Sequence, residues 1–446
     1  MSLIHKQTLE DGPGSASQQG FRSGIVLVVA ASFFIRLLAL WKIAGAPLAS
    51  DSTDYRGMAL LLLGGERFVP YWPPGLSLYL APFLEAGGGD TVLRLSMLAW
   101  WGLFCFGLVR LAGDLRIARG ATVALLAIFS VTPALIHFSI EPMTQMPSAA
   151  LLLVAMSAAV RCSEDAGWGE ALLLGGSLGW LSLVRPSALP LLLVLPGLAF
   201  LRRKQVAQPL LAVSLGAAMI FAWVVKVHQL SGQWTINNSN GVNLYYGNNP
   251  WTPMYRTWYF GSHAKLGSDE IREFPEYEVI VQRVQGLPAT ARGDEFKRLA
   301  VEYVKQRPGI FLHRTLNRVR CFWGFDIFTA ANLRGAGSRW FPVAFGMDAV
   351  CYLLVAGFAF FWIAAAPAAF WLRWETWLLG GVVLLYSAPY WISMSHPTYH
   401  FPVVAPLVLL GLMARSTGSA SRWRGWVSLA VLGLIQVEWI FNLAKS

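Results

Sequence analysis

Residues 24–43 read GIVLVVAASFFIRLLALWKI, and this stretch decides the fold class. A helix of that length spans about 30 Å, which is the thickness of the hydrocarbon core of a bilayer. Residues 212–227, AVSLGAAMIFAWVVKV, are of the same kind. Of the 446 residues, 55% are hydrophobic, and the mean hydropathy is +0.50, so one soluble core could not bury the apolar side chains. The sequence therefore predicts an all-α polytopic membrane protein.

About eleven apolar stretches are predicted to cross the membrane as helices. They are 24–43, 91–111, 120–138, 143–160, 170–184, 187–201, 208–227, 343–364, 376–393, 401–414 and 425–441. The segments between consecutive spans then alternate between the two faces of the membrane.

The net charge of +11 follows this alternation. Basic residues gather in every second short loop, at Arg116, Arg119, Arg202, Arg203, Lys204, Arg373, Arg415, Arg422 and Arg424. The positive-inside rule makes these loops cytoplasmic and places the N-terminus on the same side. A basic balance of this origin indicates membrane topology rather than a nucleic-acid partner.

The spans divide the chain into four parts. We expect a cytoplasmic tail at 1–22, a transmembrane catalytic module at 23–227 with its first outer loop at 44–90, an extracytoplasmic loop subdomain at 228–342, and C-terminal transmembrane helices at 343–446. No cleavage site follows the first apolar run, which indicates a retained anchor. The four cysteines lie far apart without CxxC spacing, so no metal site, disulfide scaffold or cofactor is predicted, and a requirement for a divalent metal is left open.

The subdomain at 228–342 contains two predicted juxtamembrane helices. Residues 294–306, DEFKRLAVEYVKQ, form an amphipathic helix that Asp294 would cap, with Phe296 and Ala300 on its apolar face. Residues 310–325, IFLHRTLNRVRCFWGF, are basic on one side and apolar on the other, which is typical of a helix lying at the membrane interface.

Two aspartates, Asp51 and Asp54, precede an apolar helical run in ASDSTDYRGMALLLLGG, residues 49–65. One interpretation is a capping box, in which Asp51 accepts a hydrogen bond from an early helix N–H. The other is catalytic, because two acids on one helix face disfavour each other's ionisation, and a carboxylate with a raised pKa suits a general base.

Two further charged residues stand at predicted outer turns. Glu141 follows the third span, where it either caps the next helix or orients a substrate hydroxyl or a cation. Arg185, in LSLVRPSALP at 181–190, lies on the face where the positive-inside rule does not favour a cation. We expect it to bind an acid, with Glu141 as the structural candidate, or a phosphate. Arg36 lies within the first span and could likewise bind an acid or a phosphate. The alternative is that its side chain extends to the membrane surface, which is called snorkelling.

Two outer segments offer further candidates for ligand binding. Residues 235–253, TINNSNGVNLYYGNNPWTP, combine turn-forming Asn and Gly with aromatic faces, as sugar sites do. The candidates in this run are Asn243, Tyr245, Asn248 and Asn249. Residues 395–406, SHPTYHFPVVAP, add His396, Tyr399 and His400 at the outer end of a late span. Two histidines without a third ligand argue against a metal site.

In their order and spacing these motifs resemble the GT-C superfamily of polytopic glycosyltransferases, especially the protein O-mannosyltransferases and the lipid A aminoarabinose transferases. The matching positions are Asp51, Tyr55, Ala59, Gly64, Gly65, Pro73 and Pro74, then Glu141, then the Arg185–Pro186 turn, then NLYYGNNP at 243–250 and FPVVAP at 401–406. Family members often carry a basic residue just before the last tyrosine, where this chain has Thr398. If that cation holds the donor phosphate, then His396, His400 or Arg314 must substitute for it.

The resemblance implies a polyprenyl-phosphate sugar donor and a glycolipid, glycan or protein acceptor on the extracytoplasmic face. It further implies inverting transfer with Asp51 as general base, Asp54 and Glu141 assisting, and Arg185 with Arg314, His396 or His400 at the donor phosphate. Tyr55 and Tyr399 would contact substrate. The sequence contains no Gly-rich nucleotide-binding loop, which argues against a nucleotide-sugar donor. The alternatives are a secondary transporter, or an outer-face polymerase or ligase of lipid-linked glycans. Cysteine and sequon usage favour a bacterial inner membrane.

Overall fold

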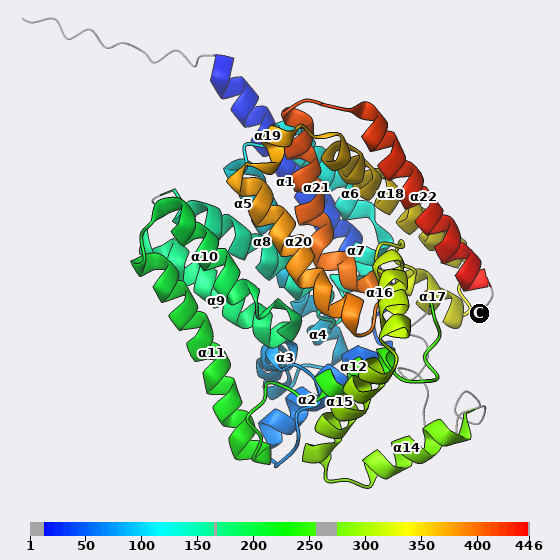
Figure 1. Cartoon of the computed structure of the whole chain (residues 1–446). Coiled ribbons are helices and arrows are strands. Elements are labelled where there is room, and N and C mark those ends of the chain that lie inside the picture. Colours follow the sequence, from blue (N-terminus) through cyan, green and yellow to red (C-terminus); the bar gives the residue numbers. More distant parts are fainter. Residues whose placement is uncertain (1–12, 165–166, 256–273, 445–446) are drawn as a thin grey trace, which may run out of the picture.

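The computed structural model describes residues 13–164, 167–255 and 274–444, and within these ranges every regular element is a helix. Eight helices or helix pairs are long and apolar enough to cross a membrane. They are α1, α4 with α5, α8, η1 with α10, α11, α18, η2 with α21, and α22. The protein is therefore a helical, multi-pass integral membrane protein (Figure 1).

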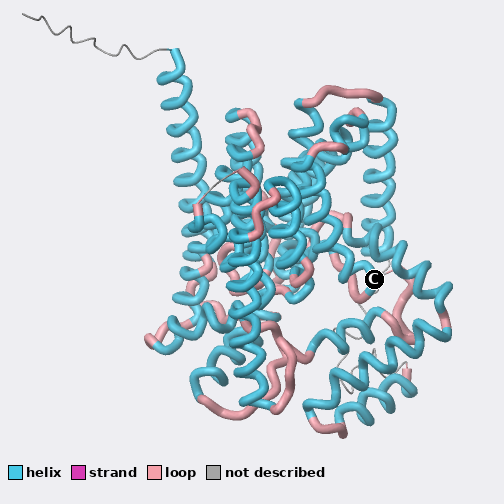
Figure 2. The backbone as a smooth tube through the Cα atoms, turned by 60° about the vertical axis from the view of Figure 1, so that its left-hand side comes forward, coloured by secondary structure: helices cyan, strands magenta, loops and turns pink. Residues whose placement is uncertain are grey.

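The bundle consists of α1 (Pro13–Lys42), α4 (Asp90–Ser96), α5 (Leu98–Asp114), α6 (Arg119–Val131), α7 (Pro133–Phe138), α8 (Gln145–Cys162), α9 (Trp168–Val184), η1 (Pro186–Ala188), α10 (Leu191–Arg203), α11 (Ala207–Ser231), α18 (Phe341–Ala365), α19 (Ala368–Trp371), α20 (Trp374–Ile392), η2 (Pro397–His400), α21 (Phe401–Ser416) and α22 (Arg422–Ala444). The remaining helices are α2 (Asp51–Gly64), α3 (Gly75–Glu85), α12 (Ser239–Gly247), α14 (Pro275–Gln285), α15 (Ala289–Gln306), α16 (Pro308–Phe322) and α17 (Phe328–Gly335). In Figure 1 the helices α2, α12, α14 and α15 gather at the end of the bundle away from the start of α1, and Figure 2 shows the helices and their connecting loops from another side.

The count of eleven spans stays a prediction. The predicted spans 120–138, 170–184 and 376–393 fall on α6 with α7, on α9 and on α20, which are not among the eight. The stretch 120–138 is broken because Pro133 follows Thr132, whose backbone is extended. The predicted tail at 1–22 is partly helical, since α1 begins at Pro13, and its first twelve residues lie outside the described part of the chain.

Burial separates central helices from peripheral ones. Within its apolar window α8 is 94% buried and the η2–α21 span 83% buried, whereas α1 and α22 are each 17% buried. The outer faces of α1 and α22 expose Val26, Phe34, Trp426 and Leu434, which suits contact with lipid. The bundle therefore packs around α8 and α21.

Helices α9 and α11 pack closely through small residues. A Cβ atom on Gly175 would lie 2.4 Å from the carbonyl oxygen of Ala212, and one on Gly179 would lie 2.9 Å from the Cα of Gly216. The four-residue spacing on both helices is the pattern that lets helix backbones approach in membranes. The approach fixes α9, which ends at Val184, directly before Arg185.

Gly175→Leu should destabilise the protein by about 1–3 kcal/mol, because the larger side chain forces α9 and α11 apart. Unfolding of the purified protein in mixed micelles by a denaturing detergent would measure the change. Gly176→Leu is the matched control, since a Cβ there meets no atom within 4 Å and gains the same helix propensity. Equal stability of the two variants would contradict the close-approach explanation.

The two helices predicted in this segment are present, with one correction. The first, α15, begins at Ala289 rather than at Asp294, so Asp294 is not its cap, while Phe296 and Ala300 are buried as predicted. The second, α16, buries Arg314 and Arg318 in the protein and leaves Leu312 and Leu316 more than half exposed, and its place at the membrane interface stays a prediction. The two arginines are buried because both bind backbone carbonyls inside the protein.

Candidate active site

Asp51 is the first residue of α2, and the residue before it has an unusual backbone. Ser50 has φ 56° and ψ −143°, and its side chain makes no capping hydrogen bond. L-residues rarely adopt this conformation, and such strain persists where the surroundings hold it in place. Asp51 is half-buried and Asp54 is exposed one turn later. The strained turn thus aims the first acid of the pair into the protein.

Helix α4 holds the segment that leads into this turn. Arg94 donates through Nε to Glu141 Oε2 at 2.8 Å and through Nη2 to Glu141 Oε1 at 3.2 Å, and it also donates to the carbonyls of Ala46 and Pro47. The Leu48 N–H donates to Asp90 Oδ2 at 3.1 Å. Both oxygens of the buried Glu141 are therefore engaged by Arg94, which is the cation that sequence reasoning did not identify.

This ion pair changes the interpretation of Glu141. Its partner is Arg94 and not Arg185, and each of its two oxygens accepts a hydrogen bond from that guanidinium. The side chains of Arg94 and Glu141 are 5% and 9% exposed, so the pair is fully inside the protein. We assign Glu141 to positioning the segment before Asp51.

Tyrosine side chains surround Asp51. The hydroxyls within electrostatic range of its carboxylate are those of Tyr55, Tyr71 and Tyr399. Tyr55 is 4% exposed and hydrogen-bonds with the side chain of Thr144, next to the Glu141 turn. Burial, and after it the negative charge of Asp51, raise the pKa of the Tyr55 phenol well above its ordinary value. This phenol therefore stays protonated and can donate a hydrogen bond.

Arg185 faces the same space from the end of α9. Its Nη1 donates to the Tyr390 hydroxyl at 3.3 Å, its guanidinium lies 5.5 Å from the ring centre of Tyr399, and its Nε is buried without a partner. Tyr55 and Tyr386 also interact with its charge. Its hydrogen bond within the described residues goes to a phenol rather than to a carboxylate, so the guanidinium keeps donors available for an anion.

Tyr399 and Tyr390 complete this side of the site. Their rings stack with centroids 4.6 Å apart, and Ser187 Oγ lies 3.1 Å from the Tyr390 hydroxyl. Asp51, Tyr55, Arg185 and Tyr399, all candidates from the sequence, are thus brought together from α2, α9 and η2. Tyr390, Tyr71 and Thr144 belong to the same group but were missed, because tyrosines near span ends are common in membrane proteins.

The Asn-rich run builds a turn instead of a binding surface. Asn249 accepts from the N–H groups of Trp251 and Thr252, and Asn248 donates to the carbonyls of Leu244 and Ile392. These bonds use the two asparagine side chains structurally. We therefore do not include Asn248 and Asn249 in the site.

Arg314 secures the same turn from α16. It donates to the carbonyls of Asn249 and Thr252, and it is 3% exposed. Its neighbour Arg318 donates to the carbonyls of Gly247 and Ile392. Both terminal nitrogens of Arg314 therefore bind carbonyls of this turn, and its Nε is buried without a hydrogen-bond partner. None of these contacts is with Asp51, Arg185 or their tyrosine neighbours, so the phosphate role expected of Arg314 stays a prediction.

Tyr245 lies in the core of the outer subdomain. It is 2% exposed and packs with Tyr277 and Phe296 between α12, α14 and α15. The next residue, Tyr246, interacts with Tyr71 beside the Asp51 group. Asn243 is half-buried on the same helix. Of the two tyrosines in this run, the one that interacts with the Asp51 group is therefore Tyr246 rather than the predicted Tyr245.

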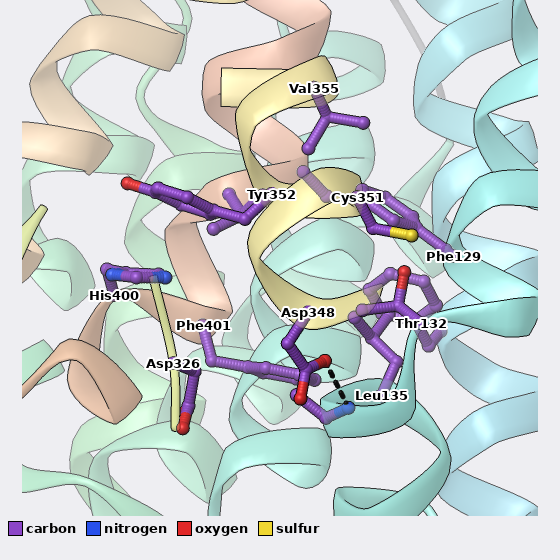
Figure 3. Close-up of a pocket in the computed structure, with 14 residues that line it drawn as sticks. Phe129, Thr132, Leu135, Asp326, Asp348, Cys351, Tyr352, Val355, His400 and Phe401 are labelled. Atoms are coloured by element: carbon purple, nitrogen blue, oxygen red, sulfur yellow. Dashed lines mark hydrogen bonds between the residues drawn. The ribbon is translucent and has the colours of Figure 1, made fainter. Parts of the chain in front are cut away.

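The two predicted histidines differ in their surroundings. The Nδ1 atom of His396 accepts from the Thr398 N–H at 3.1 Å and so caps η2. His400 is 4% exposed, and its Nδ1 lies 2.6 Å from the Phe322 carbonyl oxygen. It lines an internal cavity, to which Tyr399 does not contribute (Figure 3). Neither contact places these histidines beside Arg185.

The assembled group offers one carboxylate, one arginine with an unused donor, and a wall of phenols. Such a set can accept a proton from a hydroxyl, bind an anion and contact a sugar ring. In the described part of the chain no three His, Cys, Asp or Glu side chains converge to hold a metal ion.

No protein-family model matches this chain, and no curated protein matches it. Membership of the GT-C superfamily therefore stays a prediction from the sequence motifs.

Proposed function

We propose that this protein is an integral membrane glycosyltransferase that uses a polyprenyl-phosphate sugar on the extracytoplasmic face. Asp51 acts as general base, and Arg185 binds the donor phosphate. The acceptor is a hydroxyl of a glycolipid, a glycan or a protein. The protein would lie in a bacterial inner membrane with its N-terminus in the cytoplasm.

The observation that carries this proposal is the position of Arg185. Its buried Nε lacks a partner, and its neighbours are phenols of Tyr390, Tyr399 and Tyr55. An arginine in this setting is suited to bind a phosphate through two parallel hydrogen bonds. Asp51 shares two of these tyrosine neighbours, so a bound phosphate and the carboxylate would face the same space.

The chemistry requires one base and one anion site. The acceptor oxygen forms a bond to the anomeric carbon, the bond from that carbon to the phosphate oxygen breaks, and the acceptor proton passes to Asp51. The leaving lipid phosphate is a weak base, so it needs a cation and no general acid. Attack opposite the leaving group inverts the anomeric centre, and the site differs from the carboxylate pair of a glycoside hydrolase.

Transfer assays with radiolabelled polyprenyl-phosphate sugars test the proposal directly. Membranes that contain the wild-type protein should move label from one sugar of a panel to endogenous glycolipid, glycan or protein. Consumption of no donor, together with movement of a labelled solute into liposomes, would favour a secondary transporter. Transfer of a whole oligosaccharide would favour a glycan polymerase or ligase.

Arg185→Lys should raise the KM for the lipid donor about tenfold with a smaller change in kcat, because lysine keeps the charge and loses the planar pair of donors. Steady-state transfer at varied donor concentration would measure this change. Arg161→Lys, on the opposite face of the bundle at the end of α8, is the control and should leave KM unchanged. An unchanged KM in Arg185→Lys would remove this residue from the phosphate site.

A further inference from the structure

A cavity of about 50 Å³ lies inside the bundle. Its walls come from α5, α6, α7, α18, α21 and the turn between α16 and α17 (Figure 3). Most of the lining is apolar, with Phe104, Phe129, Leu135, Val355 and Phe401 among it. The volume has room for a few waters.

Two aspartates line this cavity without a cation. Asp326 and Asp348 are 6% and 2% exposed, and no lysine or arginine belongs to the lining. Asp348 Oδ1 accepts from the Ala134 N–H at 2.8 Å, and Asp326 Oδ1 accepts from the Phe328 N–H at 2.6 Å. The second oxygen of each, Oδ2, is buried without a hydrogen-bond partner. Each acid therefore caps a helix with one oxygen and leaves the other unsatisfied.

The other titratable groups at the cavity do not neutralise these acids. His400 has its Nδ1 beside the Phe322 carbonyl, which can only accept, so Nδ1 carries a proton and Nε2 remains. The Tyr352 hydroxyl donates to the Trp323 carbonyl at 2.9 Å, and Cys351 is a free thiol. On α7, His137 lies outside the lining and contacts the Phe328 ring edge to face.

Two ionised carboxylates in this setting would be strongly unfavourable. The acids are close enough to interact electrostatically, and the apolar walls give little screening. Burial raises the pKa of Asp326 to about 6, although the Phe328 N–H and the Thr398 side chain oppose that shift. A metal ion would need further ligands, and no third His, Cys, Asp or Glu converges on these two within the described residues.

We propose that this cavity is a proton-binding site within the membrane domain, in which Asp326 and Asp348 hold at least one proton at neutral pH. A proton on either carboxyl group removes the repulsion between the two acids, and the protonated group can then donate a hydrogen bond through its free Oδ2 atom. The site and the candidate active site share η2, since His400 lines the cavity and Tyr399 contacts Arg185. The inference stands whether or not the protein transfers sugars.

Infrared difference spectroscopy on the full-length protein in lipid nanodiscs tests this proposal. The wild type should show the C=O stretch of a protonated carboxylic acid at neutral pH, and the band should disappear on titration to alkaline pH. Asp348→Asn and Asp326→Asn keep the capping Oδ1 acceptors, so each should fold while the band is lost or shifted. Asp294→Asn, on an exposed position of α15, is the control and should leave the band unchanged.

Three results would overturn the proposal. They are a wild-type spectrum without this band at neutral pH, a band that is unchanged in both asparagine variants, and a band that falls when sodium replaces choline, because the last result would assign a metal cation to the site. If Asp348→Asn fails to fold, the wild-type spectrum and Asp326→Asn still decide the question. None of these measurements depends on sugar transfer.

Discussion

Asp51→Asn should reduce sugar transfer by about 10²–10⁴-fold while the protein stays folded. Asparagine fits the first turn of α2 and cannot accept the proton of the acceptor hydroxyl, so kcat should fall and donor binding should change little. Single-turnover transfer in nanodiscs with the donor identified from the panel would measure the loss. Thermal unfolding of the same samples would show whether the fold is kept.

Asp54→Asn is the matched control, because Asp54 lies one turn later on the same helix and is exposed. It should retain most of the activity. A large loss in Asp54→Asn with normal rates in Asp51→Asn would transfer the base role to Asp54. Normal rates in both variants would remove α2 from the chemistry altogether.

Arg94→Met should destabilise the protein by about 3–5 kcal/mol, because it leaves the buried Glu141 carboxylate without its cation. The same change frees the carbonyls of Ala46 and Pro47, which precede the strained Ser50. Transfer should therefore fall as well, although Arg94 does not contact the candidate site. Unfolding by a denaturing detergent, compared with wild type, would give the stability change.

Arg161→Met is the comparison for this ion pair. The side chain of Arg161 is 42% exposed in its pair with Asp114, so its loss should change stability by no more than about 1 kcal/mol. The double variant Arg94→Met/Glu141→Leu should recover part of the stability, because no unpaired charge remains. Equal losses of unfolding free energy in Arg94→Met and Arg161→Met would show that burial does not increase the contribution of the Arg94–Glu141 pair to stability.

The sequence was sufficient for the fold class and for part of the site. Length and hydropathy identify spans such as α1 and α11, because the bilayer imposes one length on every crossing helix. Asp51 and Arg185 were candidates because both are charged residues at predicted outer turns, next to apolar helices. Their grouping with Tyr55 and Tyr399 is what the motif order implied.

Long-range hydrogen bonds were not predictable from the sequence. From the sequence, Arg314 and Arg318 were expected on the solvent-exposed face of an interfacial helix. In the structure they instead donate to backbone carbonyls within residues 247–252. Asn249 has the composition of a sugar ligand and acts as a turn residue. The sequence shows which donors exist, whereas only the fold shows which acceptors reach them.

The buried acids Asp326 and Asp348 escaped prediction for a related reason. Asp348 sits early in α18 and Asp326 in a short turn, so each resembles an ordinary polar residue near a span end. At the break between α6 and α7, the Ala134 N–H has no partner within its own helix and donates to Asp348. This hydrogen bond joins two segments that are far apart in the chain, so no local sequence pattern predicts it.

The candidate site is gathered from α2 near the start of the chain and from α20 and η2 near its end. During synthesis Asp51 is made early, whereas Tyr390 and Tyr399 are made late, after most of the helices of the bundle. A nascent chain that lacks its last helices therefore holds a carboxylate but no assembled group of tyrosines around Arg185. If the protein transfers sugars as proposed, that activity is thereby reserved for finished molecules, and a truncated product in the membrane would be inactive.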